Sequence, residues 1–283
     1  MPDAFTYCEQ HVREGDKDRY LAALFAPAKY RRALYAHYAF NLDVARVREA
    51  AREPMAGEVR LRWWTEMLTG TARGEVTGNP VAVALREVVV RYRLPPQMLA
   101  DLIDARRFDL YDAPMATFDA LELYGVKTSS AVMDLAARIL SDGRDPGISH
   151  ISRHAGIAYS IAGLLRALPI HAARRQLYIP LEVMQRHRAQ TEDVFAGNAT
   201  VEVRAALAEM RLRARHHLAA ARGLVKNMPS AVTPALLPAV LIRPELQRME
   251  RRSYRPFRLH ERSQWRRQWT LWRAARAGLA RKL

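Results

Sequence analysis

The sequence predicts an all-α protein. Apolar residues recur at helical spacing along most of the chain, as at Leu34, Tyr38 and Leu42. No segment alternates apolar and polar residues with a period of two, and no Asn-Gly pair marks a hairpin. Apolar residues make up 49% of the 283 residues, which is enough to bury a sizeable core.

Helix-breaking and capping residues divide the chain into its predicted elements. We expect helices at 28–52, 57–68, 80–92, 96–111, 117–141, 149–168, 200–227, 234–242 and 261–283. Pro27 stands just before the first of these helices, and Asn79-Pro80 is a typical helix start. The segment 142–147 is a predicted turn, and Pro169 is expected to end the helix that precedes it.

The linkers between these helices are short, and the sequence has neither an internal repeat nor a low-complexity segment. We therefore predict a single domain over 1–283. Its last segment, 261–283, is predicted to be a basic helix that contains tryptophan.

Positive charge concentrates near the C-terminus. The 45 Lys and Arg residues and 29 Asp and Glu residues give a net charge of +16, and residues 243–283 alone hold thirteen basic and three acidic side chains. Such a segment attracts anionic lipid, acidic protein surfaces or nucleic acid, unless it is only a solvated arginine-rich face. No recognition motif accompanies the charge, so we expect no nucleic-acid partner.

The tryptophans of the expected C-terminal helix share one face. Trp265, Trp269, Trp272, Leu279 and Leu283 fall close to one stripe, and the basic residues, Arg281 and Lys282 among them, fall largely off it. A basic amphipathic helix with tryptophans suits an anionic membrane interface. The same tryptophans can instead pack against the domain, and both interpretations stay open.

Neither a membrane span nor a targeting segment is predicted. The longest apolar stretch, 231–242, is shorter than the about 20 residues that a spanning helix needs. The start of the chain has no basic and apolar regions of a signal peptide and is not a transit peptide. We therefore expect a cytoplasmic protein, peripheral on the inner face of the cytoplasmic membrane.

The common cofactor and nucleophile motifs do not occur: GxGxxG, GxxxxGK[ST], HExxH and GxSxG are all missing. The single cysteine, Cys8, excludes an internal disulfide framework. His216 and His217 are neighbours on an expected helix and point to different sides, so we predict surface histidines rather than metal ligands.

Several segments, in their order and spacing, resemble the squalene/phytoene synthase family of all-α head-to-head prenyl synthases. They are 20–25 (YLAALF), 38–40 (YAF), 57–64 (GEVRLRWW), 116–124 (ATFDALELY) and 178–180 (YIP). The resemblance extends nearly from end to end. It implies an isoprenoid-synthase-like helical bundle with a central cavity.

The catalytic pattern of that family is degenerate in this chain. Active members resemble one another in two helical Asp-x-x-x-Asp motifs, whose carboxylates share a helix face and hold Mg²⁺ against the substrate diphosphate. Aligned on 38–40 and 178–180, the four positions fall on Ala45, Glu49, Ala167 and His171. Three of the four have no carboxylate, so we expect no catalytic residue, no metal site and no cofactor.

A displaced acidic cluster is the one alternative metal site. Asp101, Asp104, Asp109 and Asp112 fall in the helix expected at 96–111 or just beyond it. Asp101 and Asp104 would be neighbours on one face. Arg106 and Arg107 lie between the acids, and solvated acids are the commoner outcome.

A second resemblance is to the branch of the family that contains the mitochondrial assembly factor of respiratory complex I. It rests on 165–175 (LRALPIHAARR), 39–41 (AFN), 180–183 (PLEV) and the region of Trp272. That branch is regarded as non-catalytic and acts at the inner membrane on biogenesis of a membrane-embedded subunit. Without a transit peptide, the chain is expected to be a bacterial homologue.

The resemblance implies a degenerate prenyl-synthase-like protein that is peripheral to the membrane and assists assembly of complex I. Its expected partners are anionic lipid, an isoprenoid or lipid ligand, and a membrane subunit of complex I. The ligand-binding candidates are Tyr38, Phe40, Asn41, Arg166, Arg174, Arg175 and Tyr178, the arginines serving to hold an anionic head group. The alternative is an active prenyltransferase that condenses prenyl diphosphates with Mg²⁺.

Overall fold

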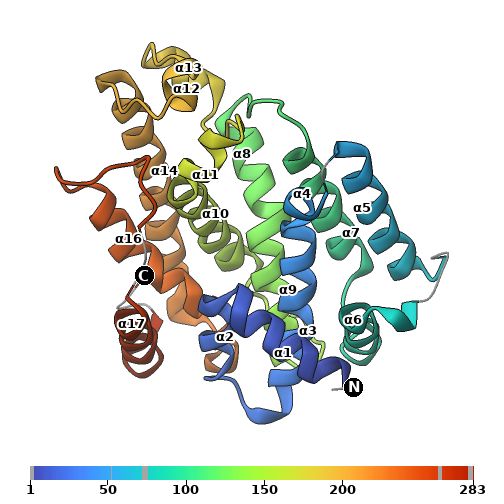
Figure 1. Cartoon of the computed structure of the whole chain (residues 1–283). Coiled ribbons are helices and arrows are strands. Elements are labelled where there is room, and N and C mark those ends of the chain that lie inside the picture. The colour runs from blue at the N-terminus through green and yellow to red at the C-terminus, as the bar shows by residue number, and fades with distance from the viewer. Residues whose placement is uncertain (1–2, 52, 72–75, 261–262, 280–282) are drawn as a thin grey trace. The chain divides into compact units, whose positions relative to one another are not determined.

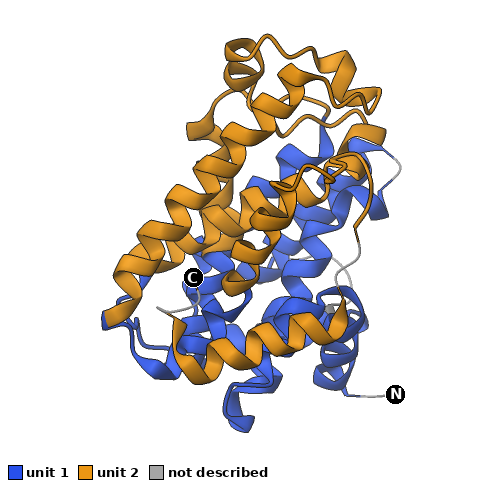
Figure 2. Cartoon of the chain, turned by 90° about the vertical axis from the view of Figure 1, so that its left-hand side faces the viewer, with its two compact units in different colours: residues 1–111, 131–149, 227–238 blue, residues 112–130, 150–226, 239–283 orange. Residues whose placement is uncertain are grey.

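The computed structural model describes residues 3–51, 53–71, 76–260, 263–279 and 283. In these ranges every regular element is a helix and no strand occurs, so the all-α prediction is confirmed (Figure 1). The chain forms two compact units (Figure 2). Unit 1 comprises residues 1–111, 131–149 and 227–238, and unit 2 comprises residues 112–130, 150–226 and 239–283. The single domain over 1–283 stays a prediction.

Unit 1 is organised around one central helix, α3 (Ala28–Ala45). Twelve of its 18 residues are buried, and they lie on every side of the helix. α1 (Ala4–Gly15), α6 (Pro80–Arg91) and α9 (Ala131–Leu140) all pack against it, and α15 (Thr233–Leu236) packs against α9. The other helices of the unit are α2 (Lys17–Ala23), α4 (Val47–Ala50), α5 (Pro54–Thr69) and α7 (Pro96–Ala105).

Unit 2 contains the longest helix described, α14, which packs against α12 and α16. Its helices are α8 (Phe118–Gly125), α10 (Ser149–Arg166), α11 (Leu168–Ala173), α12 (Leu181–Arg186), α13 (Thr191–Phe195), α14 (Val201–Leu224), α16 (Ile242–Met249) and α17 (Gln264–Ala277). No helix within the described ranges has both the length and the hydropathy needed to cross a bilayer.

Two of the long predicted helices end early or break. The helix predicted over 28–52 is interrupted at Arg46, whose backbone (φ −102°, ψ 13°) lies outside the helical range. The helix predicted over 96–111 ends at Ala105 and continues as a 3₁₀ turn, Arg106–Leu110. Neither break has a proline or glycine to mark it, so composition did not reveal them.

Two further predicted helices also break. The segment 117–141 divides into α8 and α9 because a π-helical turn, Val126–Ser130, lies between them. The helix predicted over 149–168 ends at Arg166. Pro169 does not terminate it but lies in the first turn of α11, because its ring would clash with the carbonyl four residues earlier if the helix were continuous.

The C-terminal helix is shorter than the predicted 261–283. α17 ends at Ala277, and Gly278 (φ +83°) redirects the chain. Leu279 and Leu283 are each only 3% exposed, so their predicted place on the tryptophan stripe is wrong. Arg281 and Lys282 lie outside the described residues.

A close backbone contact in unit 2 explains one glycine. A Cβ atom at Gly156 in α10 would overlap the Oγ and press against the backbone of Ser130, in the π-helical turn. The Ser130 hydroxyl donates to the carbonyl of Arg153 at 3.0 Å, which fixes the turn against α10. Only a hydrogen atom therefore fits at position 156.

We expect Gly156→Ala to lower the free energy of unfolding by about 1–3 kcal/mol, because the added methyl group overpacks this contact. Gly163→Ala is the matched control in the same helix, since a Cβ there would meet no atom within 4 Å. It should stabilise the helix by up to about 1 kcal/mol. Thermal unfolding followed by circular dichroism measures both, and equal effects at the two positions would contradict the packing argument.

Candidate functional site

The first degenerate motif falls at a helix break in unit 1. Ala45 is the last residue of α3, Glu49 lies in α4, and the chain turns between them at Arg46. The two positions therefore share no continuous helix face. The Glu49 carboxylate pairs with Arg46 at 3.9 Å. Asp43, the neighbouring acid, pairs with Nε2 of His11 at 2.7 Å.

The second degenerate motif falls at the break between α10 and α11 in unit 2. Ala167 occupies the break, and the imidazole of His171 packs on the ring of Tyr178 at 4.5 Å between centroids. Tyr178 also contacts Tyr124, at 6.1 Å. Burial lowers the pKa of His171 to about 4, and the charge of Arg174 acts in the same direction. His171 is thus a neutral ring in an aromatic cluster at neutral pH.

The acidic residues considered as a displaced metal site do not lie on one helix. α7 ends at Ala105, so the four aspartates do not share one helix, and Asp112 belongs to unit 2. Asp104 and Asp109 each pair with an arginine of the following 3₁₀ turn, at 3.7 Å and 3.2 Å. Among the described residues, no three His, Cys, Asp or Glu side chains are grouped so that they could hold a metal ion.

Three predicted ligand-binding residues lie on α3. Tyr38, Phe40 and Asn41 are all buried. The ring of Phe40 packs edge-on against Trp64 at 5.1 Å, and the guanidinium of Arg19 lies 5.9 Å from the ring centroid of Tyr38. Within the described part of the chain, Oδ1 of Asn41 is buried and accepts no hydrogen bond. α3 therefore presents an unsatisfied acceptor inside unit 1, which a donor from a ligand or water would satisfy.

A pocket of about 530 Å³ lies where α3, α4 and α5 meet. Trp63 and Trp64, whose rings form a T-shaped pair at 5.1 Å, supply its aromatic lining. Arg46 and Arg60 supply two cations, and Asp43, which lies 2.7 Å from Nε2 of His11, supplies one carboxylate. Arg46 is the residue at the break of the first degenerate motif. The pocket thus combines apolar surface with guanidinium groups, which suits an amphipathic molecule with an anionic end.

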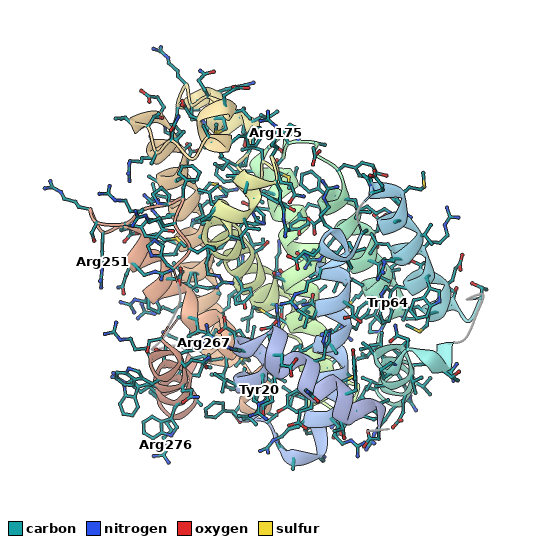
Figure 3. All side chains as sticks on the ribbon, in the orientation of Figure 1. Tyr20, Trp64, Arg175, Arg251, Arg267 and Arg276 are labelled. Carbon is teal, nitrogen blue, oxygen red and sulfur yellow. The ribbon has the colours of Figure 1, made fainter. Side chains whose placement is uncertain are left out.

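The three candidate arginines of unit 2 have different surroundings. Arg175 adopts φ +55° after α11. Its amide donates to the carbonyl of Ala172 at 3.0 Å and the amide of Gln176 donates to the carbonyl of His171 at 2.9 Å, which is the pattern of a Schellman motif. Arg175 lies near the top of the view in Figure 3. Its guanidinium lies over the ring of Phe195 at 4.6 Å. Arg174 is exposed and Arg166 is half-buried. A joint role of the three in binding a head group stays a prediction.

The segment that contains Tyr178 is fixed by a backbone clasp. The amide of Met115 donates to the carbonyl of Leu177 at 3.0 Å, and the amide of Leu181 donates to the carbonyl of Met115 at 2.8 Å. The Glu182 carboxylate accepts from the amide of Phe118 at 2.7 Å and so caps α8. The clasp positions both the loop and the first turn of α8.

Sequence reasoning missed a polar network in unit 2. Nδ1 of His154 lies 2.9 Å from Nδ1 of His217, and Nε2 of His217 lies 3.0 Å from Oε1 of Glu122. Arg213 also donates to this carboxylate. Burial raises the pKa of Glu122, but the hydrogen bonds from His217 and Arg213 outweigh it and keep that pKa below its usual value. Burial lowers the pKa of both histidines.

These shifts define the protonation of the network. The ionised Glu122 accepts the Nε2 proton of His217, so Nδ1 of the neutral His217 is an acceptor and His154 donates to it from Nδ1. The prediction that His217 is a surface histidine is wrong, whereas His216 is exposed. The signal was present in the sequence: Met210, Ala214 and His217 recur at helical spacing on the buried face of α14.

The fold and the degenerate motifs define a prenyl-synthase-type helical protein. Residues 12–273 match the family model described as squalene/phytoene synthase. The chain therefore belongs to the squalene/phytoene synthase family, as its motif order predicted. Squalene synthase HpnC of Alicyclobacillus acidocaldarius has a similar structure, with a TM-score of 0.76 and 24% identity over 90% of this chain and 95% of that one. A ligand-bound dehydrosqualene synthase gives a TM-score of 0.81 at 20% identity, over 97% and 96% of the two chains.

Sequence relatives fall into two groups. The "NADH dehydrogenase (ubiquinone) complex I, assembly factor 6" of Rattus norvegicus is 30% identical over 251 residues, covering 89% of this chain and 75% of that protein. Its Homo sapiens counterpart is 30% identical over 245 residues, covering 87% and 73%. Phytoene synthase of Arthrospira platensis is 29% identical over 271 residues, covering 90% and 86%.

One buried histidine of α3 leads to a pH prediction. His37 is fully buried, its Nε2 lies 3.0 Å from the carbonyl of Val132, and burial lowers its pKa to about 4. In the unfolded chain this histidine binds a proton below about pH 6.5, whereas in the folded chain it does so only near pH 4. Because the unfolded state binds the proton first, the free energy of unfolding falls as the pH drops from about 6.5 to about 4. We expect His37 to account for a loss of about 2–3 kcal/mol between pH 7 and 4.5.

Urea unfolding of the parent protein and of His37→Phe at both pH values measures this effect. The variant should be less stable at pH 7, because it loses a hydrogen bond, but its stability should change less with pH. His150→Gln, at an exposed position, is the control and should keep the dependence of the parent protein. If His37→Phe loses as much stability as the parent on acidification, the histidine is not the titrating group.

Proposed function

We propose that this chain is a non-catalytic member of the squalene/phytoene synthase family that acts peripherally at the membrane and assists assembly of respiratory complex I. The rat and human relatives, which are named as complex I assembly factors, support the proposal. The extent of the match, close to nine tenths of this chain, favours a shared role of the whole fold.

One observation is the main support: both places where family enzymes hold their metal lack the geometry for it. At the first place, a helix break separates Ala45 from Glu49, and Glu49 is paired with an arginine. At the second, Ala167 lies in a break and His171 is a neutral ring against Tyr178. A diphosphate leaving group needs its developing charge offset, and carboxylate-bound Mg²⁺ is the usual means. These positions offer no pair of carboxylates on one helix face.

We propose further that the protein keeps a binding role for an isoprenoid or lipid. Trp63 and Trp64 would contact the apolar part, and Arg46 and Arg60 would face its anionic end. A guanidinium binds phosphate directly and needs no metal. Organic extraction and mass spectrometry of the purified protein test this role, and it fails if no lipid is retained and none binds on addition.

Deletion of the gene in its native host is the first test of the assembly role. We expect NADH:quinone oxidoreductase activity in the membranes, and the amount of assembled complex on native gels, to fall in the deletion strain and return with a plasmid copy. Succinate:quinone oxidoreductase activity is the internal control and should not change. Full complex I activity without the gene would overturn the proposal.

The alternative is an active prenyltransferase, which the identity to a phytoene synthase favours. It predicts that the purified chain, with Mg²⁺ and farnesyl or geranylgeranyl diphosphate, releases pyrophosphate. We expect no release above the enzyme-free blank, because the carboxylates are missing. Sustained release that disappears in Glu49→Gln, the one acid left at the motif positions, would establish the enzyme instead.

A further inference from the structure

α17 presents an exposed row of aromatic rings. Three tryptophans form this tryptophan ridge: Trp265, Trp269 and Trp272, exposed by 65%, 50% and 39%. The rings of Trp269 and Trp272 stack at 5.0 Å and 15°. The guanidinium of Arg276, which Figure 3 labels on this helix, lies 4.6 Å from the ring centroid of Trp272. Exposed tryptophans in such a row are costly in water and mark an interaction surface.

The ridge faces away from the side on which the helix is buried. Leu271 and Ala274 of α17 are fully buried. At 100° per residue, they lie on the helix face opposite to the tryptophans. The helix is therefore attached through its small apolar face and leaves its large aromatic residues outside. Of the two interpretations left open by the sequence, the structure favours the outward-facing one.

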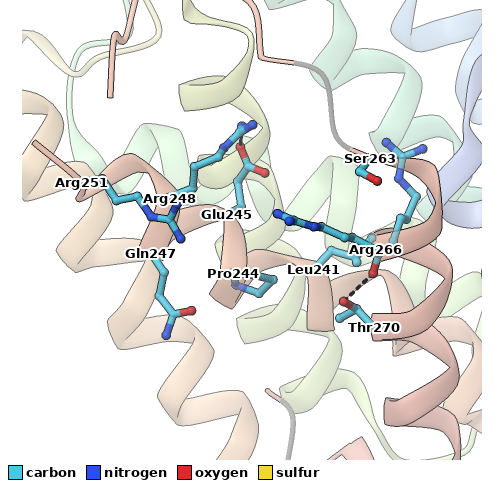
Figure 4. Close-up of a pocket in the computed structure, with 10 residues that line it drawn as sticks. Leu241, Pro244, Glu245, Gln247, Arg248, Arg251, Ser263, Arg266 and Thr270 are labelled. Atoms are coloured by element: carbon cyan, nitrogen blue, oxygen red, sulfur yellow. Dashed lines mark hydrogen bonds and ion pairs between the residues drawn. The ribbon is translucent and has the colours of Figure 1, made fainter. Parts of the chain in front are cut away.

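The same helix forms one wall of a basic cleft of about 340 Å³, the other wall being α16 and the residues that follow it (Figure 4). Four guanidinium groups line the cleft, those of Arg248, Arg251, Arg266 and Arg267, against a single carboxylate, Glu245. Glu245 is 3% exposed and pairs with Arg248. Four basic side chains and one acidic side chain thus line the cleft, and this excess of positive charge favours anionic ligand groups.

The surroundings of the cleft point to a lipid surface rather than to a single soluble anion. Residues 243–283 hold thirteen basic and three acidic side chains, and Arg251, Arg252, Arg255 and Arg258 are all exposed. Anionic headgroups attract such a field, and tryptophan prefers the boundary between headgroups and acyl chains. Guanidinium groups suit the lipid phosphates.

We propose that α16 and α17 form a docking surface for an anionic phospholipid bilayer. The exposed arginines of the cleft, Arg251 and Arg266, bind lipid phosphates, and the tryptophan ridge enters the interface. This inference rests on the proposed function in one respect: the proposed function is that of a peripheral membrane protein, and the docking surface is the part of the chain that would contact the membrane. It assigns to the C-terminal residues a site that is separate from the degenerate motifs.

Vesicle flotation of the full chain tests the docking surface. We expect the protein to float with vesicles of phosphatidylglycerol and phosphatidylcholine in equal parts, and not with phosphatidylcholine alone. Raising the salt concentration should weaken the binding, because it screens the arginine contacts. The tryptophan emission should shift to shorter wavelength on binding as the ridge leaves water.

Two pairs of substitutions separate the cleft from general charge. Arg251→Gln with Arg266→Gln removes two cleft cations and should weaken binding about thirtyfold, or about fivefold for each arginine. Arg62→Gln with Arg86→Gln, at exposed positions of α5 and α6, removes the same charge and should weaken it much less. Trp265→Ser with Trp269→Ser should remove most of the emission shift. All six substituted residues are exposed, and circular dichroism checks the fold of each double variant.

The outcomes separate this inference from the proposed function. Failure of the parent protein to float, equal losses in the two arginine pairs, or a stronger preference for single-stranded DNA that depends on the same cleft arginines would each overturn the docking surface. The deletion strain decides the assembly role independently. If vesicle binding follows the cleft while complex I is unaffected by deletion, the docking surface stands and the assembly role fails.

Discussion

Burial of α3 on all its sides is the constraint on which unit 1 depends. A helix covered by α1, α6 and α9 has no face to give to solvent, so its polar groups must be neutral or satisfied within the protein. His37 meets this requirement in part, as a neutral imidazole whose Nε2 lies within hydrogen-bond distance of a backbone carbonyl and whose Nδ1 has no hydrogen-bond partner among the described residues. Asn41 also meets it in part, because its buried Oδ1 accepts no hydrogen bond from the described residues.

The break after α3 decides the chemistry nearby. A continuous helix through Arg46 would place Ala45 and Glu49 on one face, as the metal-binding pattern requires. The observed break turns α4 away and leaves Glu49 beside Arg46. Arg46 thus offsets the charge of Glu49, the one carboxylate left at the four motif positions.

The existence of the helices could be predicted from sequence far better than their breaks. Helical spacing of apolar residues identified α3, α10 and α14, because a buried stripe extends over many residues. The break at Arg46 and the π-helical turn at 126–130 depend on contacts with distant segments, such as that of Ser130 with Gly156, and leave no local trace. The break at Ala167 did leave one in Pro169, whose place in the next helix was misjudged.

Some features of the candidate site could likewise be predicted from the sequence, and others could not. The missing carboxylates could be inferred from residue types at aligned positions. The pairing of Glu122 with His217, which are 95 positions apart, could not, since only folding brings α8 and α14 together. The stripe on α14 nevertheless contained enough information to place His217 inside.

The clasp around Met115 couples two parts of unit 2 that the sequence separates. Glu182 caps the first turn of α8, and α8 places Glu122 and Tyr124 within the unit. The loop that ends in Tyr178-Ile179-Pro180 therefore sets the position of the carboxylate that orders the two histidines. This segment, which resembles the enzymes of the family, therefore has a structural role of its own. It fixes the positions of the side chains that share protons in the network of Glu122, His217 and His154, and this role does not depend on a reaction at the site.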